Sequence, residues 1–131
     1  MLKKGNQTAL IDCGTTVQGK NIVRKLKEQG IEKIDYIFIT HPHQDHMGGL
    51  LDIVSNFQIG KIVLPNINQK MITVKWYKKI MNELDSGKYQ IENAEKDKQY
   101  NLEDVKIKII NDTYQGKNIN NYSTVLKVNY G

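Results

Sequence analysis

Several features that define large classes of proteins are missing from this chain of 131 residues. It has one cysteine, Cys13, which excludes an internal disulfide framework and favours a reducing compartment. No apolar stretch is long enough to cross a bilayer, and residues 1–6 carry two lysines but no apolar signal-peptide core. We therefore expect a cytoplasmic location and no membrane segment in this chain, while a longer parent protein would remain open to membrane attachment or export.

Repeats, linkers and low-complexity segments are also missing, and the charge is only mildly unbalanced. Hydrophobic residues make up 39% of the chain, which is enough for one compact domain with a core but too little, at this length, for two. Lysine and arginine number 19 against 14 acidic residues, giving a net charge of +5. This excess favours a well-solvated surface, with a polyanion-binding face as the alternative, and it does not by itself identify a nucleic-acid-binding protein.

The apolar pattern indicates strands that alternate with helices, followed by strands alone. The run Tyr36-Ile37-Phe38-Ile39 is typical of a strand covered on both faces, and Gly30 is placed to end the first helix. Thr73 is the expected N-cap of the third helix, and residues 118–121 have turn chemistry. We expect an α/β fold with helices packed on a mixed sheet. The expected helices cover residues 18–29, 48–60 and 74–86, and the expected strands cover residues 8–11, 34–40, 61–64, 89–91, 105–110 and 123–130.

All three histidines of the chain, His41, His43 and His46, fall within six residues, and Asp45 lies among them. Imidazole nitrogen is the commonest protein ligand for zinc and similar metals, and carboxylate oxygen often accompanies it. The cluster follows an apolar strand directly, and ligand sites of α/β folds gather at such strand ends. A solvated polar loop is the alternative, but this spacing has few uses other than metal binding.

The frame H-x-H-x-D-H at residues 41–46 resembles the signature of the metallo-β-lactamase fold superfamily. Residues 10–14, Leu-Ile-Asp-Cys-Gly, resemble that family's strand-end motif with its buried aspartate, and Gly48-Gly49 follows the histidines as the family's glycines do. Residues 39–50 and 120–131 look most like the soluble domain of ComEC-type DNA-uptake (competence) proteins and their free-standing relatives. The resemblance implies an αββα sandwich, of which residues 1–131 look like the N-terminal half, a partial domain.

The resemblance also implies a role for each residue of the cluster. His41 and His43 look like ligands of a first zinc ion, and Asp45 and His46 look like ligands of a second. Asp45 also has the catalytic role of orienting the attacking hydroxide. One or two zinc ions are implied, with manganese or iron as alternatives, and His46 is the ligand that a one-metal site would leave in an outer position.

Residues outside the cluster have weaker claims to a role in the site. Asp12 is expected to accept hydrogen bonds that hold the loop, and Cys13 to be a small buried residue rather than a ligand. The family completes its site with further ligands downstream, but no histidine follows His46 here. Asp112 precedes the expected final strand, so the family's bridging aspartate is not assigned to it.

We therefore expect a zinc-dependent hydrolase of this superfamily with a phosphodiester or nucleic-acid substrate. The alternative is a truncated or degenerate, non-catalytic metal-binding module, and the missing ligands predict little or no turnover by residues 1–131 alone. Half a sandwich is also expected to leave the apolar sides of Ile107, Ile109, Leu126 and Val128 without a covering layer. The chain should then self-associate, or need a partner that supplies the missing half.

Overall fold

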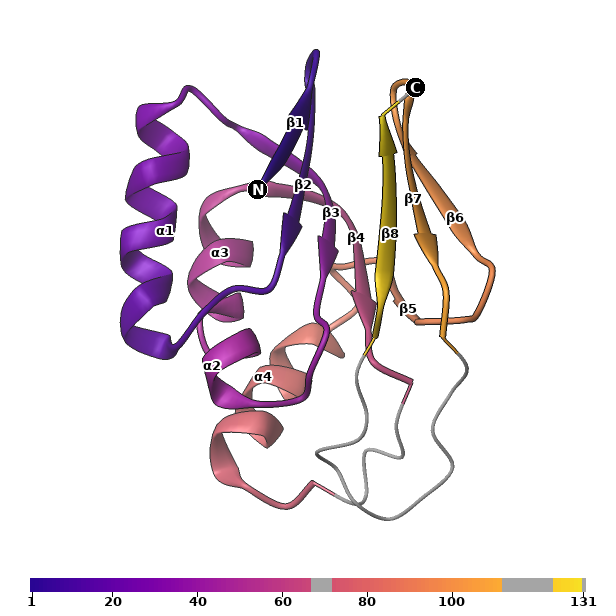
Figure 1. Cartoon of the computed structure of the whole chain (residues 1–131). Coiled ribbons are helices and arrows are strands. Elements are labelled where there is room, and N and C mark those ends of the chain that lie inside the picture. Colours follow the sequence, from indigo (N-terminus) through magenta and orange to yellow (C-terminus); the bar gives the residue numbers. More distant parts are fainter. Residues whose placement is uncertain (67–71, 112–123, 131) are drawn as a thin grey trace.

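The computed structural model describes residues 1–66, 72–111 and 124–130, and it shows an α/β fold in three layers (Figure 1). Helices form the first layer, a five-stranded mixed sheet the second and a three-stranded sheet the third (Figure 1). The expected class, with helices packed on a mixed sheet, is confirmed. The helices are α1 (Thr16–Glu28), α2 (Gln44–Met47), α3 (Leu50–Asn56) and α4 (Lys75–Leu84). The strands are β1 (Leu2–Lys4), β2 (Gln7–Ile11), β3 (Lys33–Phe38), β4 (Gln58–Leu64), β5 (Ile91–Asn93), β6 (Gln99–Leu102), β7 (Val105–Ile109) and β8 (Leu126–Tyr130).

The five-stranded sheet has the order β1-β2-β3-β4-β5 and is covered on both faces. Its first pair is an antiparallel hairpin, and the remaining pairs are parallel. Ile37 of β3 packs in the cluster shared with the helices, whereas its neighbour Phe38 packs in the cluster between the two sheets. This double covering explains why the central strands are nearly continuous apolar runs.

The three-stranded sheet, β6-β7-β8, is antiparallel and has one covered face. Ile107 and Ile109 are 0% and 1% exposed, because they pack against residues of the first sheet. Leu126 and Val128 are half-buried against the same cluster. The expectation that these side chains lack a covering layer is therefore wrong: this chain contributes strands to both sheets, and their apolar faces meet.

A polar contact also joins the two sheets. Glu92 of β5 accepts a hydrogen bond from the hydroxyl of Tyr100 in β6, and its carboxylate lies 2.8 Å from Lys98 Nζ and 3.3 Å from Lys61 Nζ. Burial alone would raise the pKa of the Glu92 carboxyl, but the hydrogen bonds from Lys98, Tyr100 and Lys61 outweigh burial and lower it.

Helix α1 begins at Thr16, two residues earlier than expected, because Thr15 caps it. The Thr15 hydroxyl accepts from the Gln18 N–H, and the Gln18 side chain accepts from the Thr15 N–H, which satisfies two otherwise free donors. At the other end Gly30 adopts a φ of 76°, as expected for the residue that ends the helix.

Other boundaries differ more from the expectation. Helix α3 ends at Asn56 and not near Gly60, which lies inside β4, where a Cβ would come within 2.4 Å of the Asp35 carbonyl oxygen. The N-cap of α4 is Val74 and not Thr73, and no side chain caps this helix. The short elements β1, α2 and β6 were not expected, and β5 begins at Ile91. Expectations for Asp112 and for residues 118–121 and 123 lie outside the described residues. Among the described residues, none of the helices has the length and apolar character needed to cross a membrane.

Candidate metal centre

The histidine cluster lies where two neighbouring parallel strands end. Strand β2 ends at Ile11 and β3 at Phe38, and these two residues are partners in the sheet. The chain continues into Asp12 on one side and into Thr40 and His41 on the other, and the Asp12 N–H donates to the Phe38 carbonyl at 2.8 Å. Side chains from two distant segments therefore meet at the carboxyl end of a buried sheet, where loops are positioned by a rigid scaffold.

Asp12 holds the loop as expected. Its Oδ1 accepts from the Thr40 N–H at 2.8 Å, and its Oδ2 accepts from the Thr40 hydroxyl at 2.7 Å. The same Oδ2 lies 2.9 Å from His46 Nδ1. Asp12 itself has a φ of 61°, a left-handed conformation that aspartate and asparagine tolerate better than most residues. One carboxylate thus fixes both ends of the histidine segment.

These hydrogen bonds determine which ring nitrogens carry protons. A hydroxyl has one hydrogen, and that of Thr40 goes to Asp12 because a carboxylate only accepts. The Thr40 oxygen must then accept from His41 Nδ1–H, 2.9 Å away. By the same reasoning His46 Nδ1–H donates to Asp12. In the neutral rings of His41 and His46, Nε2 is therefore left with a free lone pair, the form that binds a metal.

His43, Asp45 and His46 are placed by the short helix α2, whose N-cap is His43. The Nε2 atom of His43 is buried and has no hydrogen-bond partner among the described residues. Buried polar atoms are nearly always paired, so an orphaned imidazole nitrogen needs an explanation. Asp45 is 69% exposed at its side chain, and its Oδ2 lies 3.6 Å from His46 Nε2.

The donor atoms converge closely enough to hold an ion. Two groups of three residues have donor atoms that all lie within 4.8 Å of one another: Asp12, His41 and His46 form the first group, and His43, Asp45 and His46 form the second. The ring centres of His41 and His46 are 4.4 Å apart, and those of His41 and His43 are 5.8 Å apart. The orphaned Nε2 of His43 and this mixture of imidazole and carboxylate donors fit a zinc-type metal.

Burial and charge favour the neutral form of the first histidine. Burial lowers the pKa of His41, and the positive charge of His46, when it is protonated, lowers it further. A metal ligand must be unprotonated, so this shift keeps the lone pair of His41 available near neutral pH. Burial, followed by the negative charge of Asp12, raises the pKa of the Cys13 thiol. Cys13 is 0% exposed in the apolar core, as expected of a structural residue.

The structure brings together the four predicted ligands, His41, His43, Asp45 and His46. Two further residues, Asp12 and Thr40, take part in the site. Asp12 belongs to one of the metal-sized groups as well as holding the loop. Thr40 was not assigned a role, although it links Asp12 to His41 and its carbonyl accepts from the Thr124 N–H at 2.8 Å. A hydroxyl residue directly before the first histidine was the available signal in the sequence.

Two adjacent glycines, Gly48 and Gly49, let helix α3 approach the histidine loop, as expected. A Cβ on Gly49 would lie 2.3 Å from the Cys13 carbonyl oxygen and 2.8 Å from the Cα of Gly19 in α1. A Cβ on Gly48 would lie 2.4 Å from the Gln44 carbonyl oxygen. Any larger residue would push α3 away from the strand ends, so the close approach depends on glycine.

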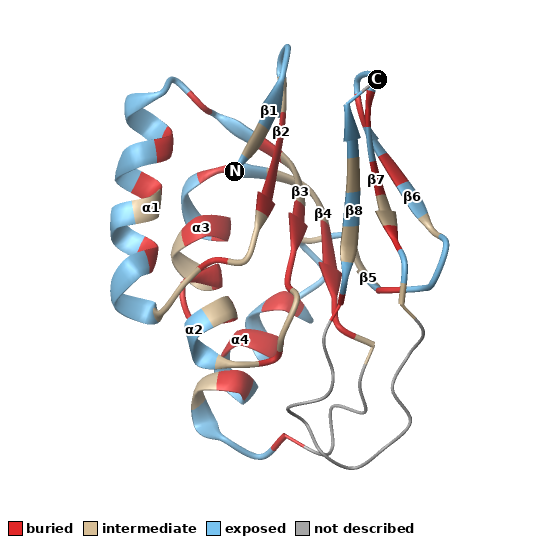
Figure 2. Cartoon of the chain, in the orientation of Figure 1, coloured by how far each residue is buried: buried red, intermediate tan, exposed pale blue. Residues whose placement is uncertain are grey.

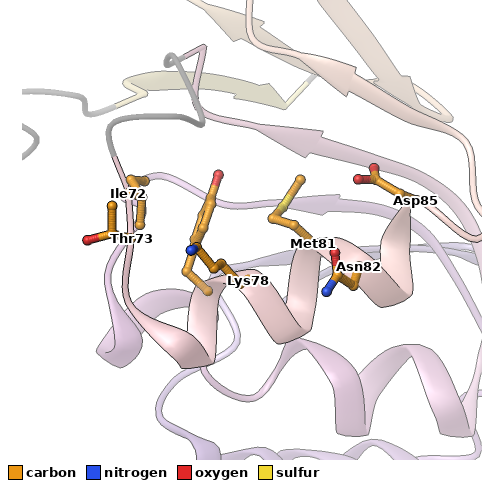
Figure 3. A pocket seen from close by; sticks show the side chains of 7 residues that line it. Ile72, Thr73, Lys78, Met81, Asn82 and Asp85 are labelled. Carbon is orange, nitrogen blue, oxygen red and sulfur yellow. The ribbon is translucent and has the colours of Figure 1, made fainter.

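A separate hollow of about 370 Å³ lies along α4, and no histidine lines it (Figure 3). Figure 3 shows Lys78, Met81 and Asn82 on α4, and Asp85, which directly follows the helix. Tyr77 also lines it, and burial, with a contribution from the charge of Asp85, raises the pKa of Tyr77 to about 12. This hollow is not part of the metal centre.

Comparison with known proteins gives a consistent result. A family model described as the metallo-beta-lactamase superfamily matches residues 1–117. Ribonuclease Z of Clostridioides difficile (strain 630) is 50% identical over 46 residues, which cover 35% of this chain and 14% of that protein. The anti-Pycsar protein Apyc1 of a Paenibacillus species (strain J14) is 32% identical over 78 residues, 58% of this chain and 31% of that protein.

Solved structures share the fold. A metallo-beta-lactamase from Cronobacter sakazakii superposes with a TM-score of 0.60 at 20% identity, over 83% of this chain and 44% of that one. The chain thus spans less than half the length of that structure, and the matches to the two curated relatives span under a third of theirs.

Proposed function

Because the chain belongs to the metallo-beta-lactamase superfamily, we propose that residues 1–131 are a partial domain of a zinc-dependent hydrolase and carry its first metal ligands. His41, His43, Asp45 and His46 are the proposed ligands. Within the superfamily we place the chain nearest the ComEC-type DNA-uptake proteins, on the sequence similarity of residues 39–50 and 120–131.

The observation that carries the proposal is the convergence of unprotonated ring nitrogens on one small volume. His41 and His46 have their Nδ1 protons directed to Thr40 and Asp12, so their Nε2 atoms are free to bind. His43 Nε2 is buried without a partner among the described residues. A buried imidazole nitrogen without a hydrogen bond is costly, and a cation held by His43 Nε2 together with the Nε2 atoms of His41 and His46 would supply the missing partner.

The chain's own residues divide the remaining tasks. A zinc ion held there would act as a Lewis acid and lower the pKa of a bound water. Asp12 and Thr40 keep the imidazole rings in one orientation and one protonation state. Asp45 is exposed and lies beside His46, so it is placed to accept a hydrogen bond from the attacking water and to orient it.

Nucleic acid is the substrate class that we favour. The similarity to ribonuclease Z supports a phosphodiester of RNA or DNA, and the net charge of +5 is compatible with a polyanion.

The test is cleavage of a fluorescent RNA oligonucleotide and of bis(p-nitrophenyl) phosphate by residues 1–131 with zinc or manganese. We expect little or no turnover by residues 1–131 alone, and any turnover should depend on the metal. The reason is that the two donor groups share His46, so they cannot each hold an ion with three residues of their own. Chelation with EDTA and Asp45→Ala should both abolish any such turnover. Asp104→Ala is the matched control, since Asp104 is also an exposed aspartate, 59% exposed at its side chain and paired with Lys4.

The shared His46 also favours a second candidate, a metal-binding module without catalytic activity. Because residues 1–131 alone are expected to show little or no turnover, the two candidates are separated by fusing the downstream half of a superfamily hydrolase after residue 131. Retained zinc binding with no cleavage of either substrate in any metal by this fusion would support the module and contradict the hydrolase. Cleavage that persists in EDTA or in Asp45→Ala would show that the activity does not come from this centre.

A further inference from the structure

The outer face of the three-stranded sheet is polar and basic. Residues along β6 and β7 alternate between buried and more exposed, which is visible as stripes (Figure 2). In β8 the half-buried Leu126 and Val128 alternate with the exposed Lys127 and Asn129. The buried set packs toward the five-stranded sheet, so the other set projects away from it (Figure 1). Three of these outward residues are lysines, three are amides and none is acidic: Gln99, Asn101, Lys106, Lys108, Lys127 and Asn129.

The register of the strands concentrates the positive charge. Lys108 and Lys127 are directly opposite each other on neighbouring strands, about 4.8 Å apart, and Lys106 lies two residues along, about 7 Å away. Like charges directly opposite each other destabilise a sheet. Within the described residues Lys108 has one acidic neighbour, Asp97 at 3.6 Å, which offsets only part of this repulsion. A bound anion would relieve it.

The amides flank the lysines and set the kind of anion that fits. Gln99 is opposite Lys108, and Asn101 and Asn129 are both opposite Lys106. Amide and ammonium groups together are the usual donors to phosphate oxygens of a nucleic-acid backbone. None of the six outward residues is aromatic, so they offer nothing on which bases could stack. The exposed apolar residues nearby, Ile110 and Val125, lie just beyond the ends of β7 and β8 and outside the six.

We propose that this face, Gln99, Asn101, Lys106, Lys108, Lys127 and Asn129, binds the phosphate backbone of a nucleic acid without sequence preference. The argument rests on charge and register and is independent of hydrolysis at the histidine cluster. It requires that this part of the sheet stays uncovered in the αββα sandwich, which its polar outward side chains favour, because a strand covered on both faces is an apolar run. The face is also connected to that cluster: Thr124, two residues before β8, donates its N–H to the carbonyl of Thr40, which precedes His41. Lys127 follows three residues later, about 10 Å along the strand.

The test is fluorescence anisotropy of a labelled 20-nucleotide single-stranded DNA, with EDTA present so that no hydrolysis intervenes. The variant Lys106→Gln/Lys108→Gln/Lys127→Gln should bind at least tenfold more weakly at about 50 mM salt. Its plot of log affinity against log salt should be less steep by about 2, because each lost phosphate contact removes about 0.7 from a single-strand slope. The control Lys20→Gln/Lys25→Gln/Lys27→Gln on α1 removes the same charge from exposed positions and should change affinity less than threefold.

The proposal would be overturned by equal weakening in both triple variants, or by a wild-type chain that does not bind the DNA. Sedimentation of the wild type with phosphatidylserine vesicles, combined with no DNA binding, would point to a membrane surface instead. If the triple variant does not fold, Lys106→Gln and Lys127→Gln separately should each lower the slope by about 0.7, and an unchanged slope in both would overturn the proposal.

Discussion

The two sheets of this chain differ in how many of their faces are covered. In β3 the successive residues Ile37 and Phe38 are both at most 1% exposed, because helices cover one face and the second sheet covers the other. In β7 the successive residues differ in burial: Lys106 is exposed, whereas Ile107 is 0% exposed. The proposed metal ligands follow the strand that is covered twice, where the backbone is held firmly. The proposed nucleic-acid-binding face belongs to the three-stranded sheet, which has one uncovered face.

The largest expected effect tests this comparison by removing side chains at successive positions. Ile37→Ala, Phe38→Ala and Ile107→Ala should each lower the free energy of unfolding by about 2–5 kcal/mol, because each leaves a cavity in a packed core. Lys106→Ala should stay within about 0.5 kcal/mol of wild type. Urea denaturation followed by circular dichroism measures all four. The comparison fails if Lys106→Ala is as damaging as Ile107→Ala, or if either Ile37→Ala or Phe38→Ala is silent.

A smaller effect on stability, but a large one on metal binding, is expected for Asp12→Asn. Asparagine tolerates the left-handed backbone of Asp12, yet its NH₂ group cannot accept from the Thr40 hydroxyl or from His46. Zinc affinity measured by calorimetry should fall about 10–100-fold, the usual result of losing a hydrogen bond behind a ligand.

Asp35→Asn is the matched control for this change. Asp35 is also a partly buried aspartate, 15% exposed at its side chain. It accepts a hydrogen bond of 2.8 Å from the Thr8 N–H, and within the described residues it has no hydrogen bond to a histidine. Its substitution should leave zinc affinity unchanged. An equal loss of affinity in both variants would mean that Asp12 acts through general stability and not through the imidazole rings.

The polar contact between the sheets predicts a pH-dependent difference for Glu92→Gln. The folded pKa of Glu92 is lowered, so its contribution to stability is full above its ordinary pKa of 4.5 and is lost as the pH falls through the lower folded value. At pH 7 the variant should be about 1–3 kcal/mol less stable than wild type, since it loses hydrogen bonds to a charged group. The gap should close as the pH is lowered below 4.5 in urea titrations. A gap that stays constant or widens in acid would contradict the assigned role.

Much of the fold and of the candidate site could be predicted because the responsible signals are local. The apolar run at 36–39 indicated a doubly covered strand, and the spacing of His41, His43 and His46 indicated a metal site. The capping of α1 was harder to place: Thr15 and Gln18 form the cap, but the apolar pattern starts later. Short elements such as α2 and β6 carry too few apolar residues to show a period.

The rest depends on contacts between distant residues, which a single sequence does not encode locally. The burial of Ile107 and Ile109 follows from the meeting of two sheets within this chain, whereas the resemblance to half a sandwich suggested an uncovered face. The role of Thr40 needs Asp12, 28 residues earlier, to be next to it. The outward alignment of Lys108 and Lys127 depends on the register of β7 and β8.

Zinc titration by isothermal calorimetry tests the central claim most directly, that the histidines at the end of the doubly covered sheet hold a metal. We predict measurable binding by the wild-type chain and a loss of at least 100-fold in His41→Ala/His43→Ala, since both remove ligands rather than their hydrogen-bond partners. The lysine triple variant of the three-stranded sheet should bind zinc as the wild type does, and melting curves in EDTA should show that each variant is folded. Equal zinc binding by the wild-type chain and the folded double-histidine variant would contradict the metal centre.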